Sequence, residues 1–243
     1  MAHAGGRPPG LSIGDITRAG RQIGLADLSL NAVALKLEVT PAALYRHVAN
    51  RWDLERVVGE AILADLHIAE EPDHDIEQYL TCMGLQLRDF ILKHPGLASY
   101  IQTLFPRGEA GRRLLSTTAQ ALGRRGYSLD AAIVLSSAVA SIAIGYAATE
   151  ELQRSRTEGY HSEYSLAVDG MFADAELSAA QRRLPQIEPA EYVRLWLGAA
   201  VSGFVAAAPP GRTVEEIRSA LDTATSLPTT ISQHRSTTGV NHG

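Results

Sequence analysis

The stretch from Ser29 to Leu66 limits the fold most, because it predicts two short helices with room for only a tight turn between them. Ser29 can cap the first helix through its hydroxyl group, and apolar residues then recur at helical spacing over residues 30–37. Residues 38–39 leave space for a turn alone. Thr40-Pro41 follows, a good capping residue ahead of a proline at the first helical position. Two short helices joined in this way are typical of a helix-turn-helix.

The second of these helices, expected from Thr40 to about Val48, carries the residues that indicate DNA as a partner. Leu44 and Val48 fall on its inner side, whereas Tyr45 and Arg46 face outward. We expect Arg46 to contact a guanine or a phosphate, because a guanidinium group can form two hydrogen bonds with a guanine edge. A helical hairpin with no DNA-binding role is the alternative. The expected DNA-contacting residues are Ser29, Thr40, Pro41, Ala42, Tyr45, Arg46, His47 and Arg51.

A family resemblance covers most of the chain. In the N-terminal part it rests on Val33-Ala34, Leu37-Glu38-Val39, Leu44-Tyr45-Arg46-His47-Val48, Asn50-Arg51 and Leu54. In the C-terminal part it rests on His94-Pro95-Gly96, Gly126-Tyr127-Ser128 and Gly145. Residues 12–61 thereby resemble the TetR family of transcriptional repressors, and residues 80–208 are more loosely similar to the C-terminal domain of the tetracycline-repressor type. The resemblance implies that the second short helix is the recognition helix. It also implies that a fourth helix, starting near Trp52, links the DNA-binding head to a ligand-sensing body.

Composition and charge agree with a helical DNA-binding protein. Ala and Leu dominate most segments and no run alternates in the manner of a strand, which predicts an all-α fold. The fold class expected is a three-helix helix-turn-helix domain followed by a larger helical domain for ligand binding and dimerisation. The net charge is −5, but residues 1–60 carry seven basic and six acidic residues, so this part is +1 and the remainder −6. Such a head predicts modest non-specific DNA affinity that dimerisation must strengthen.

Four segments are expected along the chain. Residues 1–11 are rich in Gly and Pro and are predicted to form a flexible arm. Residues 12–69 form the helix-turn-helix domain with the connecting fourth helix, which ends before the break at residues 70–73. Residues 74–225 form the ligand-binding and dimerisation domain, in which residues 156–187 are expected to be polar and irregular. Residues 226–243 lack a buried pattern and are predicted to be disordered.

Two long helices rich in small residues, expected at 128–153 and 189–208, predict a homodimer. Small side chains let helices approach closely, and one copy of the chain offers little to cover both of them. The family resemblance implies that such a pair forms a four-helix bundle across a two-fold axis. The alternative is that both are ordinary core helices of a monomer. Replacing Gly145 or Gly203 with a bulky residue distinguishes the two if either glycine lies in the contact.

The resemblance also implies a small-molecule effector. His67 falls where the tetracycline repressor uses a His to contact its drug, but Met83, Leu87 and Ile101 stand where the repressor has an Asn, an aromatic residue and a metal-binding His. A magnesium-chelated tetracycline is therefore not expected. A medium-sized hydrophobic molecule suits the apolar residues of this region, although each of them could equally serve core packing. The expected ligand-binding residues are His67, Met83, Leu87, Phe90, Leu104, Phe105, Leu115 and Ile142.

The sequence offers no grouping that favours an enzyme, a cofactor or a metal site. It has no glycine-rich phosphate loop and no nucleophile elbow. His161-Ser162-Glu163 is expected to be an isolated H-x-E in a loop, without the two downstream cysteines that a zinc deaminase needs. The function expected is a ligand-released repressor that binds a palindromic operator. A constitutive or protein-regulated DNA-binding factor is the alternative, and a helical enzyme is the remote one.

The expected location is the cytoplasm. Cys82 is the single cysteine, which excludes an intramolecular disulfide. The start of the chain lacks the apolar core of a signal peptide. Residues 131–148 are long and apolar enough to be considered as a membrane span, but Ala and Ser dominate them, so close helix packing is expected instead and no membrane partner.

Overall fold

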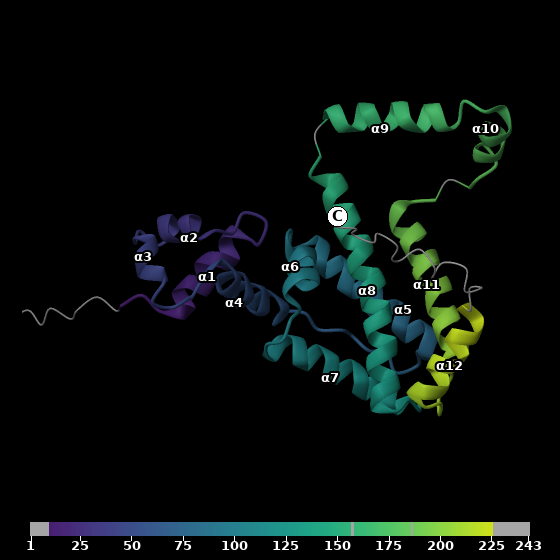
Figure 1. Cartoon of the computed structure of the whole chain (residues 1–243), viewed down its shortest axis with the longest axis horizontal. Helices are drawn as coiled ribbons and strands as arrows, with labels where there is room; N and C mark the ends of the chain where they lie inside the picture. The colour runs from purple at the N-terminus through teal and green to yellow at the C-terminus, as the bar shows by residue number, and fades with distance from the viewer. Residues whose placement is uncertain (1–9, 157, 186, 226–243) are drawn as a thin grey trace, which may run out of the picture.

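The computed structural model describes residues 10–156, 158–185 and 187–225, and these residues form twelve helices and no strand (Figure 1). The prediction of an all-α fold is thus confirmed. The helices form a small N-terminal head, a larger body and an arm that projects from the body (Figure 1). The predicted flexible arm at residues 1–11, except for its last two residues, and the predicted tail at residues 226–243 lie outside the described residues.

Four helices make up the head, and their starts follow from local capping. They are α1 (Ile13–Ile23), α2 (Leu30–Lys36), α3 (Pro41–Leu44) and α4 (Arg51–Leu63). Ser12 and Asp15 form a full capping box at the start of α1. The Ser29 hydroxyl accepts the Ala32 amide at 3.1 Å, and the Asn50 side chain does the same for the Asp53 amide at 3.0 Å. Because each cap lies within three residues of its target, the sequence pattern alone could identify these helix starts.

Two helices of the head are shorter than expected. Helix α3 ends at Leu44 rather than near Val48, and residues 45–47 form a turn in which the amides of His47 and Val48 both bond to the Leu44 carbonyl. Thr40 occupies the N-cap position of α3 but makes no side-chain capping bond. Helix α4 ends at Leu63 rather than near Ile68. A tight turn closes it, and the guanidinium group of a distant arginine binds its last carbonyls.

The body is built around one long helix. Helix α8 (Leu129–Arg154) packs against α5 (Ile76–Leu92), α6 (Leu97–Leu104), α7 (Glu109–Arg124) and α11 (Pro189–Ala207), and α12 (Val214–Thr225) contacts α11. Helix α8 is long and apolar enough to cross a membrane by composition alone, as noted from the sequence. However, eight of its residues, from Ala131 to Ala147, are buried within the protein. Its apolar character therefore serves the core of the body.

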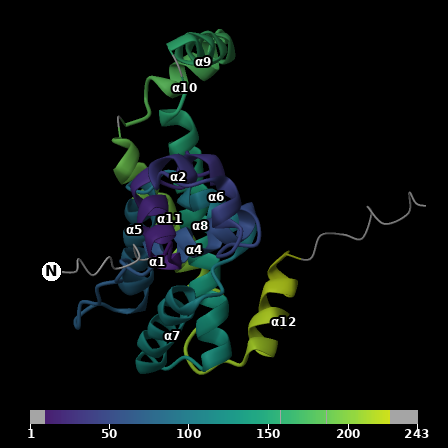
Figure 2. The ribbon, with the colours of Figure 1, turned by 90° about the vertical axis from the view of Figure 1, so that its left-hand side faces the viewer.

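The segment between α8 and α11 differs from the irregular region that was expected. It contains α9 (Glu158–Met171) and α10 (Ala175–Gln181), which together extend away from the body as an arm (Figure 1, Figure 2). His161-Ser162-Glu163 accordingly lies within helix α9 and not in a loop. The Asp174 carboxylate accepts two amides at the start of α10, so local capping explains this helix. Large apolar side chains of the arm are exposed: Tyr164, Leu166, Met171, Leu177 and Leu184.

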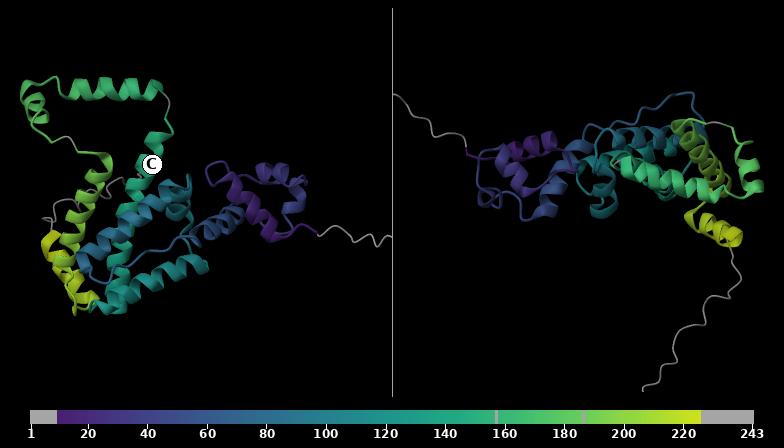
Figure 3. Two further views of the ribbon diagram at one scale, coloured as in Figure 1. Left: turned by 180° about the vertical axis from the view of Figure 1, so that it is seen from behind. Right: turned by 90° about the horizontal axis from the view of Figure 1, so that it is seen from above.

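Two hydrophobic cores hold these elements together. The first belongs to the head, but it continues without interruption into the ends of α5, α6 and α8 through Ile91, Leu97, Tyr100 and Ile144. The second lies within the body among α5, α7, α8, α11 and α12. Head and body are consequently joined by shared packing, and both views of Figure 3 show α4 running from the head toward the body.

Candidate functional site

Helix α3 and the turn that follows it, residues 45–47, present most of the residues that were expected to contact DNA. Leu44 and Val48 are buried beneath this surface and fix its position on the head. Tyr45 is 55% exposed, and Arg46 and His47 are exposed beside it. Within the described residues, the Arg46 guanidinium group has no ion-pair partner, so its donors are available to a ligand. The remaining exposed members of the predicted set are Thr40, Pro41, Ala42 and Arg51.

The turn between α2 and α3 fixes the angle between the two helices. Glu38 adopts a φ of 54°, a left-handed conformation that is uncommon for a residue other than glycine. Backbone bonds from its amide to Leu35 and from the Val39 amide to Ala34 close the turn. This conformation costs on the order of 1 kcal/mol. The packing of Val33 and Ala34 in the core of the head holds the turn in place.

Two predicted contact residues already have partners within the head. Ser29 is half-buried because its hydroxyl group caps α2. The Arg51 Nε donates to Glu55 at 2.7 Å, although the arginine side chain remains 67% exposed. Their roles toward DNA stay predictions.

Two exposed residues that the sequence reasoning did not include lie on the elements that carry these contact residues. Lys36 ends α2, and Trp52 is exposed in the first turn of α4 next to Arg51. An exposed tryptophan directly after a cation at the start of a helix is a signal that the sequence could have provided. A lysine in the last turn of a helix, such as Lys36, is too common to indicate a functional residue.

The residues expected to bind an effector divide between the two hydrophobic cores and the surface. Met83 and Ile142 belong to the core of the body, whereas Leu87, Phe90 and Leu104 pack against the core of the head. Phe105 and Leu115 are 73% and 39% exposed, so these two do not line an enclosed cavity in this structure. His67 is exposed, with its Nδ1 3.0 Å from the Asp65 carbonyl oxygen. The effector site therefore stays a prediction.

Two surface hollows lie elsewhere. One is bordered by α1 and α4, with Thr17, Arg21 and Ala61 in its wall. The other lies between the α7–α8 turn and the start of α12. The Tyr127 side chain borders this second hollow, and its buried hydroxyl group has no hydrogen-bond partner among the described residues. Burial raises the pKa of the Tyr127 hydroxyl, which keeps it neutral.

A buried ion pair connects α5 and α8. The Nε and Nη2 atoms of Arg88 each lie 2.6 Å from one oxygen of Glu150. The two side chains are 8% and 15% exposed. The bond to Glu150 raises the pKa of the Arg88 guanidinium further above its ordinary value, so the charge of Arg88 is permanent. Because 62 residues separate the partners, no local sequence pattern indicates this pair.

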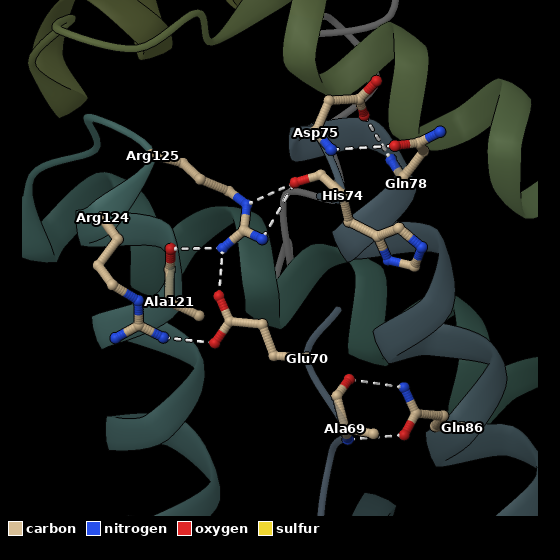
Figure 4. Close-up of polar contacts among 9 residues, drawn as sticks. All are labelled: Ala69, Glu70, His74, Asp75, Gln78, Gln86, Ala121, Arg124 and Arg125. Carbon is tan, nitrogen blue, oxygen red and sulfur yellow. Dashed lines mark hydrogen bonds and ion pairs between the residues drawn. The ribbon is translucent and has the colours of Figure 1, made fainter. Parts of the chain in front are cut away.

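The connection between α4 and α5 is fastened to both α5 and α7 (Figure 4). Ala69 forms two bonds with the Gln86 side chain, at 2.8 and 3.1 Å. Glu70 binds Arg124 and Arg125 at the end of α7, with a distance of 2.6 Å to Arg125. The hydrogen bond from Arg125 holds the pKa of Glu70 below its ordinary value, and the hydrogen bond from Arg124 adds a smaller effect in the same direction. The segment that the sequence indicated as a break between domains is thus anchored at several points.

Metal binding has no support within the residues that the structure describes, where no three His, Cys, Asp or Glu side chains gather in a way that could hold an ion.

Comparison with known proteins finds similarity in structure alone. No protein-family model matches the chain, and no curated protein sequence matches it. The TetR family protein ActR from Streptomyces coelicolor, in complex with actinorhodin, is 20% identical with a TM-score of 0.70, and the match covers 85% of this chain and 100% of ActR. A variant of TetR from Acinetobacter baumannii AYE, in complex with minocycline, is 21% identical with a TM-score of 0.57, covering 81% of this chain and 97% of the other.

The transcriptional regulator SCO7222, a TetR from Streptomyces coelicolor, is 19% identical with a TM-score of 0.59, and the match covers 81% of this chain and 98% of SCO7222. Each match includes nearly the whole of the other chain. At these identities the likeness establishes the fold of the present chain.

Proposed function

We propose that this chain is a transcriptional regulator of the TetR family that binds operator DNA as a homodimer and releases it when an effector binds. The exposed surface of α3 is the observation that carries the proposal. The turn that directly follows it offers a tyrosine, an arginine and a histidine, and the core of the head holds this turn in place through Leu44 and Val48, within a fold shared with known regulators. As a regulator of transcription, the protein acts in the cytoplasm.

Arg46 is the residue that we expect to read the DNA sequence. The test is to select duplexes from a randomised library with the purified chain, and then to measure the affinity of variants for the best duplex. Arg46→Ala should lose about 1–3 kcal/mol on that duplex if the arginine reads a base. Arg18→Ala is the matched control, because Arg18 is an exposed arginine on α1 whose ion-pair partner among the described residues is Asp15. Equal affinities for wild type and Arg46→Ala would remove α3 from the interface.

The exposed faces of α8 and α11 support a homodimer. Val134 on α8 and Tyr192, Leu195 and Trp196 on α11 are large apolar residues left exposed in the single chain, with Trp196 53% exposed. A Cβ added at Gly203 would meet nothing within its own chain, so its small size suits a close neighbour outside the chain. Gly145 is equally open.

Sedimentation of wild type and of a Gly203→Leu variant tests this assembly. The wild type should sediment as a dimer at micromolar concentration, and the variant should dissociate at concentrations where wild type does not. A monomeric wild type at tens of micromolar would refute the dimer. If the dimer binds a palindromic operator, the half-sites should lie about 34–36 Å apart.

Release by an effector requires that the body and the head be coupled. A coupling of about 1–3 kcal/mol, or about 5–150-fold in affinity, is typical, and it must act equally in both directions. Minocycline and actinorhodin, which are bound to two proteins of the same fold, are the first compounds to test. Calorimetry with and without the selected duplex decides the matter, because a compound that binds equally well in both cases is not an effector.

A constitutive or protein-regulated DNA-binding factor is the second candidate. The positions of Phe105 and Leu115 favour it, because both are exposed where an enclosed effector cavity was expected. On this alternative, small molecules would not change the thermal stability of the chain, whereas a true ligand stabilises the folded state by mass action.

A further inference from the structure

The structure assigns a positioning role to Glu60 and Arg113: we propose that they form a latch between α4 and α7 that sets the orientation of the DNA-binding head against the body. This inference rests on the proposed function, because it concerns how the head is held for operator binding. The latch is reciprocal. Each residue extends from its own helix to the free end of the other helix.

Glu60 supplies the first half of the latch. From α4, its Oε1 accepts the Gly108 amide at 2.8 Å and its Oε2 accepts the Ala110 amide at 3.1 Å, both at the start of α7. The first amides of a helix have no partner within it, and a negative charge there is favourable. The Tyr100 hydroxyl, from α6, lies 3.4 Å from the same Oε1. One carboxylate therefore joins three helices.

Arg113 supplies the second half. From α7, its Nη2 lies 2.9 Å from the carbonyl oxygen of Ala64 and 3.1 Å from that of Leu66, with Leu63 at 3.4 Å. The Ala64 and Leu66 carbonyls lie just beyond the last residue of α4, and a positive charge is favourable at this end of a helix. The opposite charges of the two residues thus each match the helix end that they bind.

The close approach at Glu60 depends on the size of residue 108. A Cβ built at Gly108 would lie 2.3 Å from the Glu60 carboxyl carbon, so a larger residue would force the Glu60 side chain to move. Residue 108 must therefore be glycine for the carboxylate to reach the start of α7 in this way. The φ of Gly108 is −80°, so its backbone conformation alone would not demand a glycine.

The two attachments, through Glu60 and through Arg113, restrain the orientation of α4 more than either attachment alone. With a single bond, α4 could pivot about it, but Glu60 and Arg113 hold two separate points along the last turns of α4. The other end of α7 is tied to the chain that follows α4, because Glu70 binds Arg124 and Arg125 (Figure 4). Helix α7 therefore contacts α4 and the segment that follows α4 at three places: near its start, in its second turn and at its end.

The latch also defines how a change in the body reaches the head. Glu60 binds amides that directly follow the connection between α6 and α7, residues 105–108. Phe105 in this connection has a φ of 51°, a left-handed conformation that large side chains rarely adopt. Because Glu60 binds these amides, the position of this connection and that of α4 depend on each other.

The test compares latch variants with matched controls on the same helix. Glu60→Ala and Arg113→Ala remove the two halves. Glu109→Gln removes a charge from the same end of α7, and Arg112→Ala removes the neighbouring arginine. Within the described residues, neither side chain forms a hydrogen bond or ion pair with α4. Glu60→Gln and Arg113→Lys are the conservative variants, which keep an acceptor and a cation respectively and should recover part of the effect.

Two quantities are measured on full-length protein that retains wild-type helicity. The first is affinity for a duplex selected with wild type, which should fall about tenfold or more in each alanine variant and less than twofold in the controls. The second is the distance between spin labels at Leu35→Cys on α2 and Thr117→Cys on α7, in a Cys82→Ala background. Labelled chain is diluted with unlabelled chain, so that only distances within one protomer are recorded. This distribution should broaden or shift in the alanine variants, to a smaller extent in Glu60→Gln and Arg113→Lys, and not in the controls.

The two measurements separate the failure of the latch from the failure of the proposed function. If wild type selects no duplex, the proposed function is wrong, while the spin-label distances still decide whether the latch holds the head. If wild type binds DNA but the latch variants keep both its affinity and its distance distribution, the latch is refuted. If the alanine variants fail to fold, the same comparison is made with Glu60→Gln and Arg113→Lys, and wild-type values in both of these variants refute it equally.

Discussion

Removal of Arg88 alone should destabilise the protein strongly, whereas removal of both Arg88 and Glu150 should not. In Arg88→Met, the Glu150 carboxylate stays buried between α5 and α8, with Arg154 as its remaining cation at 3.7 Å. Breaking a buried pair by removing one partner typically costs about 3–5 kcal/mol, because the charge that is left has no compensation. Arg154 compensates in part, so we expect about 3 kcal/mol. Asp89, the other partner of Arg88, is 58% exposed and loses little.

The double variant Arg88→Met/Glu150→Leu tests the reason for this cost. Replacing both members of a buried pair with apolar residues of similar volume is often neutral or stabilising. The double variant should therefore recover to within about 1 kcal/mol of wild type. The coupling between the two substitutions then far exceeds the ~0.5 kcal/mol seen for independent sites.

Urea unfolding followed by circular dichroism measures both effects. With a slope of about 2–3 kcal/mol per molar urea, a loss of 3 kcal/mol lowers the midpoint by about 1–1.5 M. All variants must be compared at one protein concentration, because the proposed dimer would make stability depend on concentration. If the double variant is as unstable as Arg88→Met, the cost comes from lost packing and not from an unpaired charge, and the reasoning is wrong.

Three further substitutions have outcomes that the structure specifies. Because the folded state lowers the pKa of Glu70 from near 4.5, Glu70→Gln should be less stable than wild type above about pH 5, and this difference should disappear as the pH falls through the lowered value; a difference that persists in acid would contradict this origin. Gly96→Ala should cost about 2 kcal/mol in thermal unfolding, since residue 96 has a φ of 87° and a Cβ would lie 2.5 Å from the Ala26 amide nitrogen. Gly59→Ala places a Cβ 2.5 Å from the buried Tyr100 ring and should cost about 1–3 kcal/mol, and a fully stable variant would show that α4 and α6 can separate without penalty.

The sequence predicted most of the helices because their signals are local. Ser12, Asp75 and Ser128 cap helices whose apolar spacing follows at once, and the caps are present in the structure. The arm formed by α9 and α10 was missed for the opposite reason. Its apolar residues face solvent in the single chain, so the pattern of a buried stripe that sequence reasoning depends on does not arise there.

The candidate site was only partly accessible to sequence reasoning. The exposure of Tyr45 and Arg46 follows from the burial of Leu44 and Val48 on either side of them, a pattern visible within a few residues of sequence. The Glu60–Gly108 contact joins residues 48 positions apart, and the Arg88–Glu150 pair joins residues 62 apart. No periodicity connects such positions. The scattered placement of the predicted effector residues has the same cause, because apolar residues that line a cavity and those that fill a core look alike in sequence.

The shared packing of head and body limits how this protein can be rebuilt. A designer who wished to transfer this head, with its proposed DNA specificity, to another helical body would cut at residues 70–73, between α4 and α5. That cut would strip the head of Ile91, Leu97 and Tyr100, which complete its hydrophobic core. The excised head would carry an exposed apolar face. It would then aggregate, or it would pack against the helical body of the other protein in an arbitrary orientation. A functional chimera therefore has to carry α6 and the adjoining turns of α5 and α8 along with the head, so that the unit of transplantation is discontinuous in sequence.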